Sequence, residues 1–196
     1  MLKPTRQRGF TLIELMVALV IGLVLMLGLT TFLINNIRSN SDTLKAIRLN
    51  QEMRATMMLM SRELRRAGYW ASTASGTNPF QTMTTSTAGC VLYSYDRNAT
   101  ASATVPSDVQ YGFLRASGAV YMRSSGANYN CTPGVNNVWE AVTDDNVTNI
   151  SALSFVPSSA TGTIAITLVG ELKNASEVKQ TLTETVKLEN GPLTFN

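Results

Sequence analysis

The stretch RGFTLIELMVALVIGLVLMLGL occupies residues 8–29 and places one carboxylate, Glu14, near the start of an apolar run. From Leu15 to Ile34 twenty residues carry no charge, which is about the length that a helix needs to cross the hydrocarbon core of a bilayer. A charged side chain inside such a span costs roughly 2.5–3.5 kcal/mol on insertion scales, so a carboxylate there needs a partner or a function. The stretch therefore predicts a membrane-spanning helix with a functional carboxylate at its start.

Charge is distributed unevenly along the 196-residue chain. Lys3, Arg6 and Arg8 precede the apolar run and equal the whole net charge of +3. By the positive-inside rule they keep this end in the cytoplasm, so the residues after the span are expected outside. Residues 35–68 carry seven basic and three acidic side chains, whereas residues 69–196 carry six basic and nine acidic ones. We therefore expect a basic stem (35–68) and one acidic globular head (69–196).

The composition disfavours an enzyme. The chain has no histidine, which removes the commonest general base and the commonest transition-metal ligand. Asp144, Asp145 and Asn146 offer oxygen ligands of the kind that calcium prefers, but their spacing differs from that of an EF-hand loop, and such a cluster more commonly forms a turn or a helix cap. We expect no catalytic residue, no cofactor and no metal site.

Cys90 and Cys131 are the two cysteines of the chain, and both follow the predicted span. A small, even number of cysteines outside the cytoplasm usually indicates a disulfide. We expect Cys90 and Cys131 to be bonded to each other, with two unpaired buried thiols as the alternative.

The order of features at the N-terminus differs from that of a secretory signal peptide, whose cleavage site follows the apolar stretch. Here the only small residue near a plausible cut, Gly9, precedes that stretch. The sequence RGFTLIELMVALVIG, with basic residues before Gly9, then Phe10, and Glu14 as the fifth residue after the junction, resembles the class III signal of type IV pilins and pseudopilins. The resemblance implies cleavage between Gly9 and Phe10 by a prepilin peptidase, N-methylation of Phe10, and assembly of the mature helices into a filament.

This resemblance also gives Glu14 a partner. The amino group that cleavage would leave on Phe10 is a cation, and Glu14 lies about one helical turn further along. Pairing Glu14 with the Phe10 amine of a neighbouring subunit would satisfy both charges where water is scarce, and it would set the axial register of the filament. The alternative is a carboxylate that reaches the lipid headgroups near the membrane edge.

No proline or strong breaker interrupts the sequence between Phe10 and Gly68, so we expect one continuous helix over residues 10–68. The methionines at 53, 57, 58 and 60 are expected to fill the core that this helix shares with the head. Apolar residues recur at steps of three or four along its second half, and this stripe is expected to face the head. The stripe consists of Ala46, Leu49, Met53, Met57, Met60, Leu64 and Ala67.

The end of the predicted helix resembles the junction of PilW-like minor pilins, in which a long helix ends at an Arg-x-Ala-Gly-Tyr motif. Arg65, Ala67, Gly68 and Tyr69 fit this motif. Basic side chains in a last helical turn favour the helix dipole, and glycine suits a left-handed terminating position.

The rest of the chain has the character of a small β-rich head. Residues 71–89 lack periodicity and are expected to form a loop. Six later segments have strand character, and the second and third are expected to form a β-hairpin around residues 116–118. These segments are 90–95, 108–115, 119–123, 151–156, 163–172 and 178–189. We predict an α+β fold in which the long N-terminal helix packs on an antiparallel β-sheet head, as in the type IV pilin fold.

This reading divides the chain into four parts. We expect a leader over residues 1–9 that is removed on maturation, a transmembrane or filament-core helix over 10–34, an amphipathic helix over 35–68 and the head over 69–196.

The resemblance implies a structural role in assembly rather than catalysis. We expect a minor pilin that primes type IV pilus assembly, sits at or near the pilus tip and contributes to motility, adhesion or DNA uptake. The alternative is a J-like minor pseudopilin of a type II secretion system.

The expected partners follow from this role. They are other minor pilins and the major pilin through the N-terminal helices, the prepilin peptidase, the inner-membrane assembly platform, the membrane and a candidate tip adhesin; a nucleic acid is left open. We expect a single-pass inner-membrane protein with a cytoplasmic N-terminus and a periplasmic head, which later becomes part of the extracellular pilus.

Overall fold

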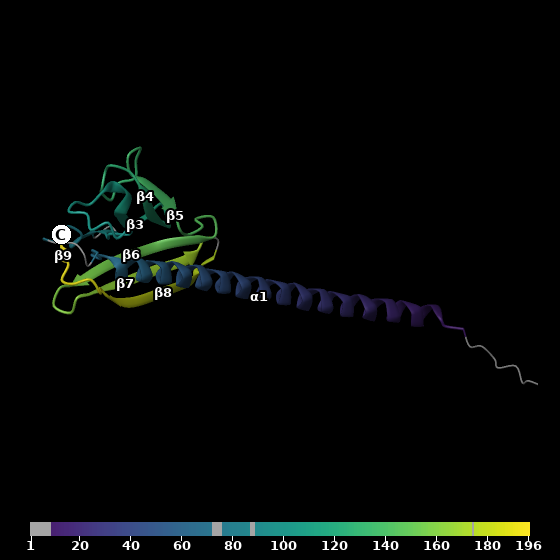
Figure 1. Ribbon diagram of the computed structural model, residues 1–196. Coiled ribbons are helices and arrows are strands. Elements are labelled where there is room, and N and C mark those ends of the chain that lie inside the picture. Colours follow the sequence, from purple (N-terminus) through teal and green to yellow (C-terminus); the bar gives the residue numbers. More distant parts are fainter. Residues whose placement is uncertain (1–8, 72–75, 87–88, 174) are drawn as a thin grey trace, which may run out of the picture. The chain divides into compact units, whose positions relative to one another are not determined.

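The computed structural model describes residues 9–71, 76–86, 89–173 and 175–196. The chain divides into two compact units, Met1–Leu44 (the N-terminal unit) and Lys45–Asn196 (the C-terminal unit). One helix, α1 (Leu12–Arg66), contributes to both units (Figure 1). The continuous helix expected over residues 10–68 is therefore present, and it begins two residues later and ends two residues earlier.

In the N-terminal unit the large apolar side chains of α1 are all exposed. Their exposed fractions from Leu12 to Ile37 range from 45% at Ile34 to 79% at Leu12. By length and composition this helix could cross a membrane. The hydroxyls of Thr30 and Thr31 donate to the carbonyls of Met26 and Leu27, at 2.7 and 2.6 Å, so that these polar groups are satisfied within the helix itself.

The C-terminal unit contains two β-sheets. A six-stranded sheet has the order β5-β4-β3-β2-β1-β9, and a three-stranded sheet has the order β6-β7-β8. All neighbouring strands are antiparallel except β1 and β9, which are parallel. The strands are β1 (Thr82–Ser86), β2 (Cys90–Ser94), β3 (Gln110–Ala116), β4 (Ala119–Ser125), β5 (Val138–Ala141), β6 (Thr148–Ser158), β7 (Thr163–Leu172), β8 (Ala175–Lys187) and β9 (Thr194–Phe195), and a short 3-10 turn, η1 (Ser107–Val109), precedes β3. The α+β class expected from the sequence is confirmed, with the strands divided between two sheets.

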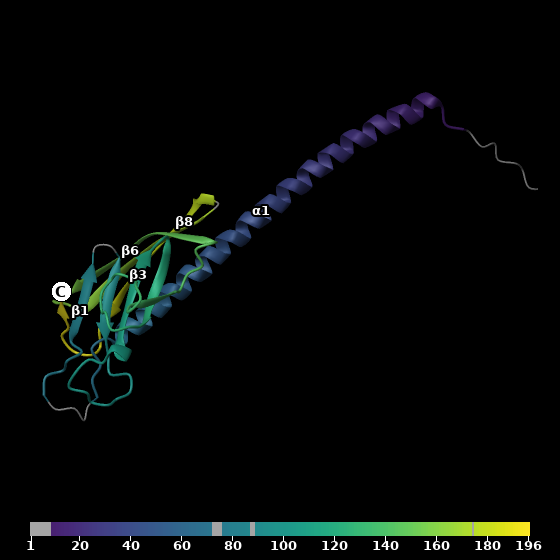
Figure 2. The same ribbon diagram turned by 90° about the horizontal axis from the view of Figure 1, so that it is seen from above.

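The last turns of α1 lie against both sheets (Figures 1 and 2). The predicted stripe is buried from Leu49 to Ala67, and Ala46 at its start is half-buried. On β7, side chains alternate between core and surface, and Ile164, Ile166 and Leu168 are fully buried. Helix and sheet come so close that a side chain on Gly170 of β7 would place its Cβ 2.9 Å from the Met53 sulfur.

One methionine of the stem departs from the expectation. Met53, Met57 and Met60 are buried, but Met58 is 71% exposed. The prediction that it belongs to the core is wrong, because position 58 lies on the opposite side of the helix from the buried stripe.

The outer strands of the six-stranded sheet were not predicted. Strand β1 lies inside the segment 71–89 that was expected to be a loop, and β5 and β9 lie outside every predicted strand. The predicted hairpin between β3 and β4 is confirmed, and Ser117 and Gly118 form its turn with φ of 49° and 78°. Both positive φ values are what a two-residue hairpin turn requires.

Met60 and Met58 give a matched test of this packing. Met60→Ala removes a side chain that is 0% exposed and should lower the free energy of unfolding by about 2–5 kcal/mol, because the closed core cannot fill the cavity. Met58→Ala, two residues away on the exposed side, should change it by less than about 0.5 kcal/mol. Denaturant unfolding of the full chain in detergent measures both, and equal effects would contradict the assigned core face.

Candidate assembly site

The first turn of α1 holds Glu14 through a reciprocal pair of contacts with Thr11. The Glu14 backbone N–H donates to the Thr11 hydroxyl, and the Thr11 backbone N–H donates to the Glu14 carboxylate, both at 3.4 Å. The Thr11 hydroxyl also donates to the same carboxylate oxygen of Glu14, at 3.4 Å. This is a capping box, in which a threonine before the helix and a glutamate three residues later satisfy each other's backbone donors.

Sequence analysis missed this local role of Glu14, although the signal is present in the Thr-x-x-Glu spacing of residues 11–14. The negative charge in the first turn also favours the helix dipole. A carboxylate at this position is therefore compatible with a stable helix start before any neighbour is present.

Gly9 and Phe10 lie immediately before this capped turn, outside the helix. Phe10 is 84% exposed, and the space around a Cβ on Gly9 is empty. Glu14 is exposed too, and among the described residues its side chain contacts the backbone N–H and the hydroxyl of Thr11. The geometry leaves the carboxylate open to a cation from another chain, while cleavage, methylation and register stay predictions.

The other end of α1 is tied to the body of the C-terminal unit. Gly68 takes a φ of +78°, and its N–H donates to the Ser94 carbonyl of β2 at 2.9 Å. The Asn190 side chain donates to the carbonyls of Arg65, Arg66 and Ala67 at 3.1 to 3.2 Å. A residue near the C-terminus thus satisfies carbonyls that the helix itself leaves without partners.

Glycine is required at position 68 for two reasons. The positive φ strains other residues, and a Cβ there would lie 2.5 Å from a methyl carbon of Leu193. The Ala-Gly-Tyr part of the motif recognised in the sequence therefore marks the point where the helix ends and the chain enters the sheets.

A small buried polar group follows the last turn. The Glu63 carboxylate, 5% exposed, accepts the Tyr95 hydroxyl at 3.1 Å and pairs with Arg66 at 3.2 Å. The hydrogen bond with Tyr95, followed by the charge of Glu63, raises the pKa of Arg66. Burial, followed by Glu63, raises the pKa of Tyr95. Arg66 is thus committed to an internal partner.

The outer face of the six-stranded sheet is covered by a loop that a disulfide attaches to it. Cys90 on β2 and Cys131 in the loop are bonded, as the sequence predicted. Cys90 is fully buried with Leu92 and Leu114, and Cys131 packs on this small cluster. The bond joins positions 41 residues apart.

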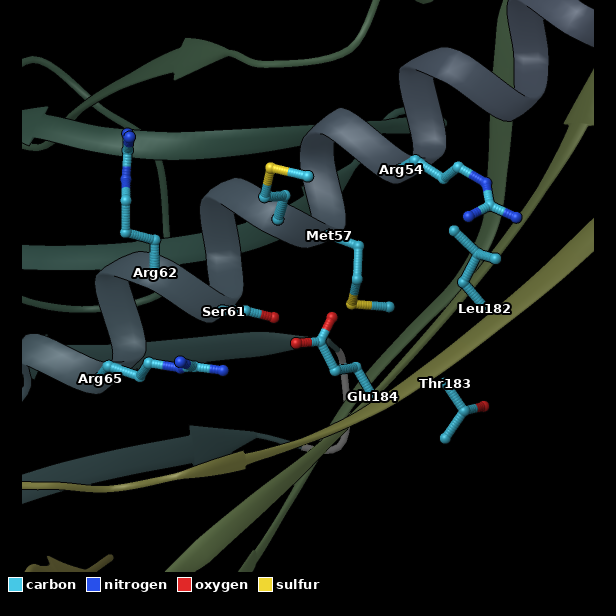
Figure 3. A pocket seen from close by; sticks show the side chains of 9 residues that line it. Arg54, Met57, Ser61, Arg62, Arg65, Leu182, Thr183 and Glu184 are labelled. Atoms are coloured by element: carbon cyan, nitrogen blue, oxygen red, sulfur yellow. The ribbon is translucent and has the colours of Figure 1, made fainter.

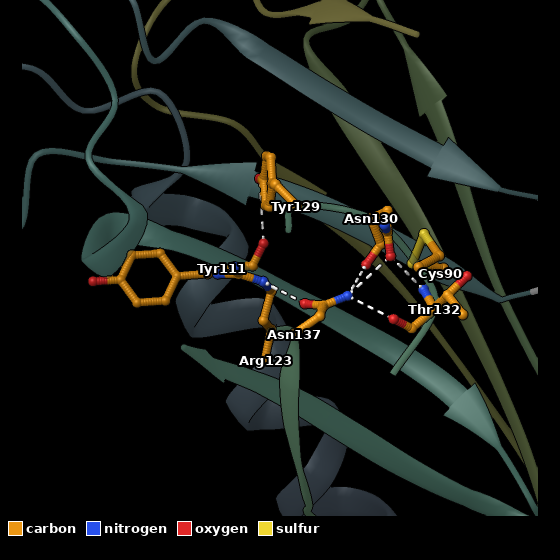
Figure 4. The surroundings of a disulfide bond; sticks show 8 residues. Cys90, Tyr111, Arg123, Tyr129, Asn130, Thr132 and Asn137 are labelled. Atoms are coloured by element: carbon orange, nitrogen blue, oxygen red, sulfur yellow. Dashed lines mark hydrogen bonds between the residues drawn. A yellow bond between two sulfur atoms is a disulfide. The ribbon is translucent and has the colours of Figure 1, made fainter. Parts of the chain in front are cut away.

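Arg123 organises the same loop from inside (Figure 4). It is 1% exposed, donates to the backbone carbonyls of Gln110, Gly126 and Asn128, and lies 2.9 Å from the Asn137 side-chain oxygen that accepts its Nε–H. Asn137 in turn donates to carbonyls of the loop. Burial lowers the pKa of Arg123. Among the described residues no carboxylate pairs with it, so backbone carbonyls, the Asn137 side-chain oxygen and the face of the Tyr129 ring compensate its charge.

The acidic cluster around Asp144 is a turn, as the sequence analysis favoured. The Asp144 side chain accepts the backbone N–H of Asn146 at 3.0 Å. Glu52 of α1 accepts the backbone N–H of Asp144 and the hydroxyl of Thr148, which fastens the turn to the helix. Across the described ranges, no group of three or more histidine, cysteine, aspartate or glutamate side chains could hold a metal ion.

Comparison with known proteins finds two family models, one that matches the N-terminal segment and one that matches most of the C-terminal unit. The family model described as prokaryotic N-terminal methylation motif matches residues 4–30. The family model described as prepilin peptidase-dependent protein B matches residues 42–188, three quarters of the chain. The chain belongs to the prepilin peptidase-dependent protein B family.

Membership of this family confirms the resemblance to pilin-like proteins with a class III signal. Its description indicates processing by a prepilin peptidase, and the signal together with the apolar helix fits a membrane-anchored pilin. Pilin-like families are structural proteins. No curated protein and no solved structure matches this chain.

The disulfide should contribute substantially to the stability of the C-terminal unit. Cys90→Ser combined with Cys131→Ser should lower the free energy of unfolding by about 4 kcal/mol, the chain-entropy value for a loop of this length. Denaturant unfolding of the full chain measures this, with reduced wild-type protein as the control. Intact-mass measurement after alkylation provides the direct check, and two alkylated thiols before reduction would contradict the bond.

Proposed function

We propose that this chain is a minor pilin that primes the assembly of a type IV pilus and stays at or near its tip. The observation that carries the proposal is the combination of a prepilin-type N-terminus with a head of the prepilin peptidase-dependent protein B family. The peptidase would cut between Gly9 and Phe10 at the cytoplasmic face of the inner membrane, and Phe10 would be N-methylated.

The exposed apolar helix supports an assembly role in two environments. The large apolar side chains from Phe10 to Ile37 leave 45–84% of their surface exposed within the unit, so lipid must cover it before assembly and neighbouring helices must cover it afterwards. In both environments a single carboxylate needs compensation. Glu14 would find it in the Phe10 amine of a neighbour, which would place adjacent subunits in a fixed axial register.

The distribution of charge supports contact with unlike neighbours. The stem over 35–68 has an excess of four basic residues and the sequence over 69–196 an excess of three acidic ones. Surfaces of opposite sign suit specific contacts between different subunits and suppress wrong partners. A subunit that begins the filament once, and that meets the other minor pilins in doing so, fits this distribution. The J-like pseudopilin of a secretion system shares these features, so the experiment below includes secretion as a readout.

The role of Glu14 can be separated from its capping role. Glu14→Gln removes the charge but keeps a residue that serves at the same position of a capping box, so membrane insertion and folding of the head should persist. Incorporation into sheared filaments should fall about tenfold or more, because the neighbour's amine then lacks its anion. Thr11→Val removes the capping hydroxyl and keeps the charge, and it should incorporate near the wild-type level. Wild-type incorporation of Glu14→Gln would place the register elsewhere.

If the chain primes assembly, its deletion should strongly reduce the number of filaments even though it forms only a small part of their mass. Deleting the chain should abolish or sharply reduce surface filaments, although quantitative mass spectrometry of purified filaments should find only a small amount of it. Filaments made mainly of this chain would identify a major pilin instead. Normal filaments with retained secretion substrates would favour the pseudopilin.

A further inference from the structure

A groove runs between the outward side of α1 and strand β8, entirely within the C-terminal unit (Figure 3). Its volume is about 530 Å³. The side chains that line it are Arg54, Met57, Met58, Ser61, Arg62 and Arg65 from α1 and Leu182, Thr183 and Glu184 from β8.

The groove exists because α1 covers β7 and stops short of β8. Leu168 of β7 is 0% exposed, but its register partner on β8, Leu182, is only partly buried. Ile166 of β7 is likewise fully buried beside Glu184 of β8. The helix-facing side of β8 is therefore only partly covered by α1, and β8 is also an edge strand of its three-stranded sheet.

The groove offers unsatisfied polar groups as well as apolar surface. The Ser61 hydroxyl is buried and has no hydrogen-bond partner among the residues that the structure describes. Figure 3 shows the Glu184 carboxylate turned toward α1 near Ser61, with Arg54 and Arg65 at opposite ends of the groove. The exposed thioether of Met58 and the side chain of Leu182 supply the apolar part.

The excess charge of the groove is positive. Three arginines and one glutamate line it, and within the described ranges no ion pair joins Glu184 to any of the three. Arg62 lies 3.9 Å from Glu63, and Arg54 donates to Asn50. Arg65 has no side-chain partner in the described part of the chain. An occupant that brings carboxylates would therefore meet the Arg65 guanidinium and the two terminal NH₂ groups of Arg54, because Arg54 donates to Asn50 through its Nε–H.

Two other occupants fit less well. The first is a strand of another chain that pairs with the edge strand β8. An inward-pointing charged side chain keeps edge strands from pairing with one another, and Glu184 occupies that position on β8. A second copy of the chain would also bring the same basic helix face, and like charges opposite each other are unfavourable.

We propose that this groove docks an acidic segment of an unlike pilin-type subunit. Carboxylates of that segment pair with Arg54 and Arg65, and an apolar side chain packs on Met58 and Leu182. This inference rests on the proposed function, because it names the class of partner that a priming subunit would hold through its head.

The test uses photocrosslinking of the full chain. p-Benzoylphenylalanine replaces Met58 in the groove or, as a control, Val135, which is 97% exposed in the disulfide-bonded loop. Each other prepilin-type subunit of the same assembly, purified at full length in detergent, is the probe. The proposal expects a crosslink from position 58, and none from 135, to an acidic segment of one of these subunits. No crosslink from position 58, or a crosslink only to a second copy, overturns it.

Charge variants supply the second readout. Arg54→Gln with Arg65→Gln should lower the crosslink yield about tenfold at low salt, and raising the salt should weaken wild-type crosslinking in the same direction. Arg97→Gln with Lys179→Gln removes two exposed charges elsewhere on the unit and should leave the yield unchanged. Equal yields from the two double variants overturn the proposal, and denaturant unfolding midpoints equal to that of the wild-type chain show that both variants are folded.

The two proposals fail in different ways. If deletion of the chain abolishes filaments while Arg54→Gln with Arg65→Gln keeps full crosslinking, the groove is not the docking site and the priming function stands. If deletion leaves filaments unaffected, the priming function itself is wrong, and the groove inference fails with it.

Discussion

The burial of one apolar stripe of α1 against two sheets at once is the interaction on which the C-terminal unit depends. The six-stranded and three-stranded sheets share no strand ladder, so the helix side chains from Leu49 to Leu64 supply much of the core that they have in common. The end of the helix is then fixed by Gly68 and Asn190, from opposite ends of the sequence of this unit. Stem and head are consequently one folding unit beyond Lys45, rather than a rod attached to a separate domain.

The two parts of α1 therefore have different surfaces, each suited to different surroundings. From Leu15 to Ile34 it carries no charge and is exposed, which is the pattern of a helix covered by lipid or by other helices. After Lys45 one side is core and the other carries arginines. Arg62 and Arg66 both pair with Glu63, whereas Arg54 and Arg65 pair with no carboxylate in the described part of the chain and remain available for recognition. Stability and recognition thus use opposite sides of one element.

The long periodic elements were predictable, and the short paired ones were not. The apolar stripe of α1 and the alternation of buried and exposed side chains on β7 follow from the helical and strand periods, because one side of each element faces the core and the other faces solvent. Strands β1 and β9 are short and polar, and they form because chain segments more than a hundred residues apart pair with each other. The exposure of Met58 also follows from the helical period, because position 58 lies opposite the buried stripe. At the N-terminus the Thr-x-x-Glu spacing of residues 11–14 encodes the capping contacts locally, so this feature was predictable as well.

The disulfide has a mechanical consequence for the head. Under tension applied to the two ends of the chain, the segment between Cys90 and Cys131 is bypassed, because force passes through the sulfur atoms. A stretch of 41 residues, which would add about 140 Å of contour length if it were unravelled, cannot extend. Strands β3 and β4 lie inside this closed loop, together with Arg123 and the backbone carbonyls of Gln110, Gly126 and Asn128 that accept from it. The central strands of the larger sheet would therefore stay paired with one another under a load that unravels the chain outside the loop.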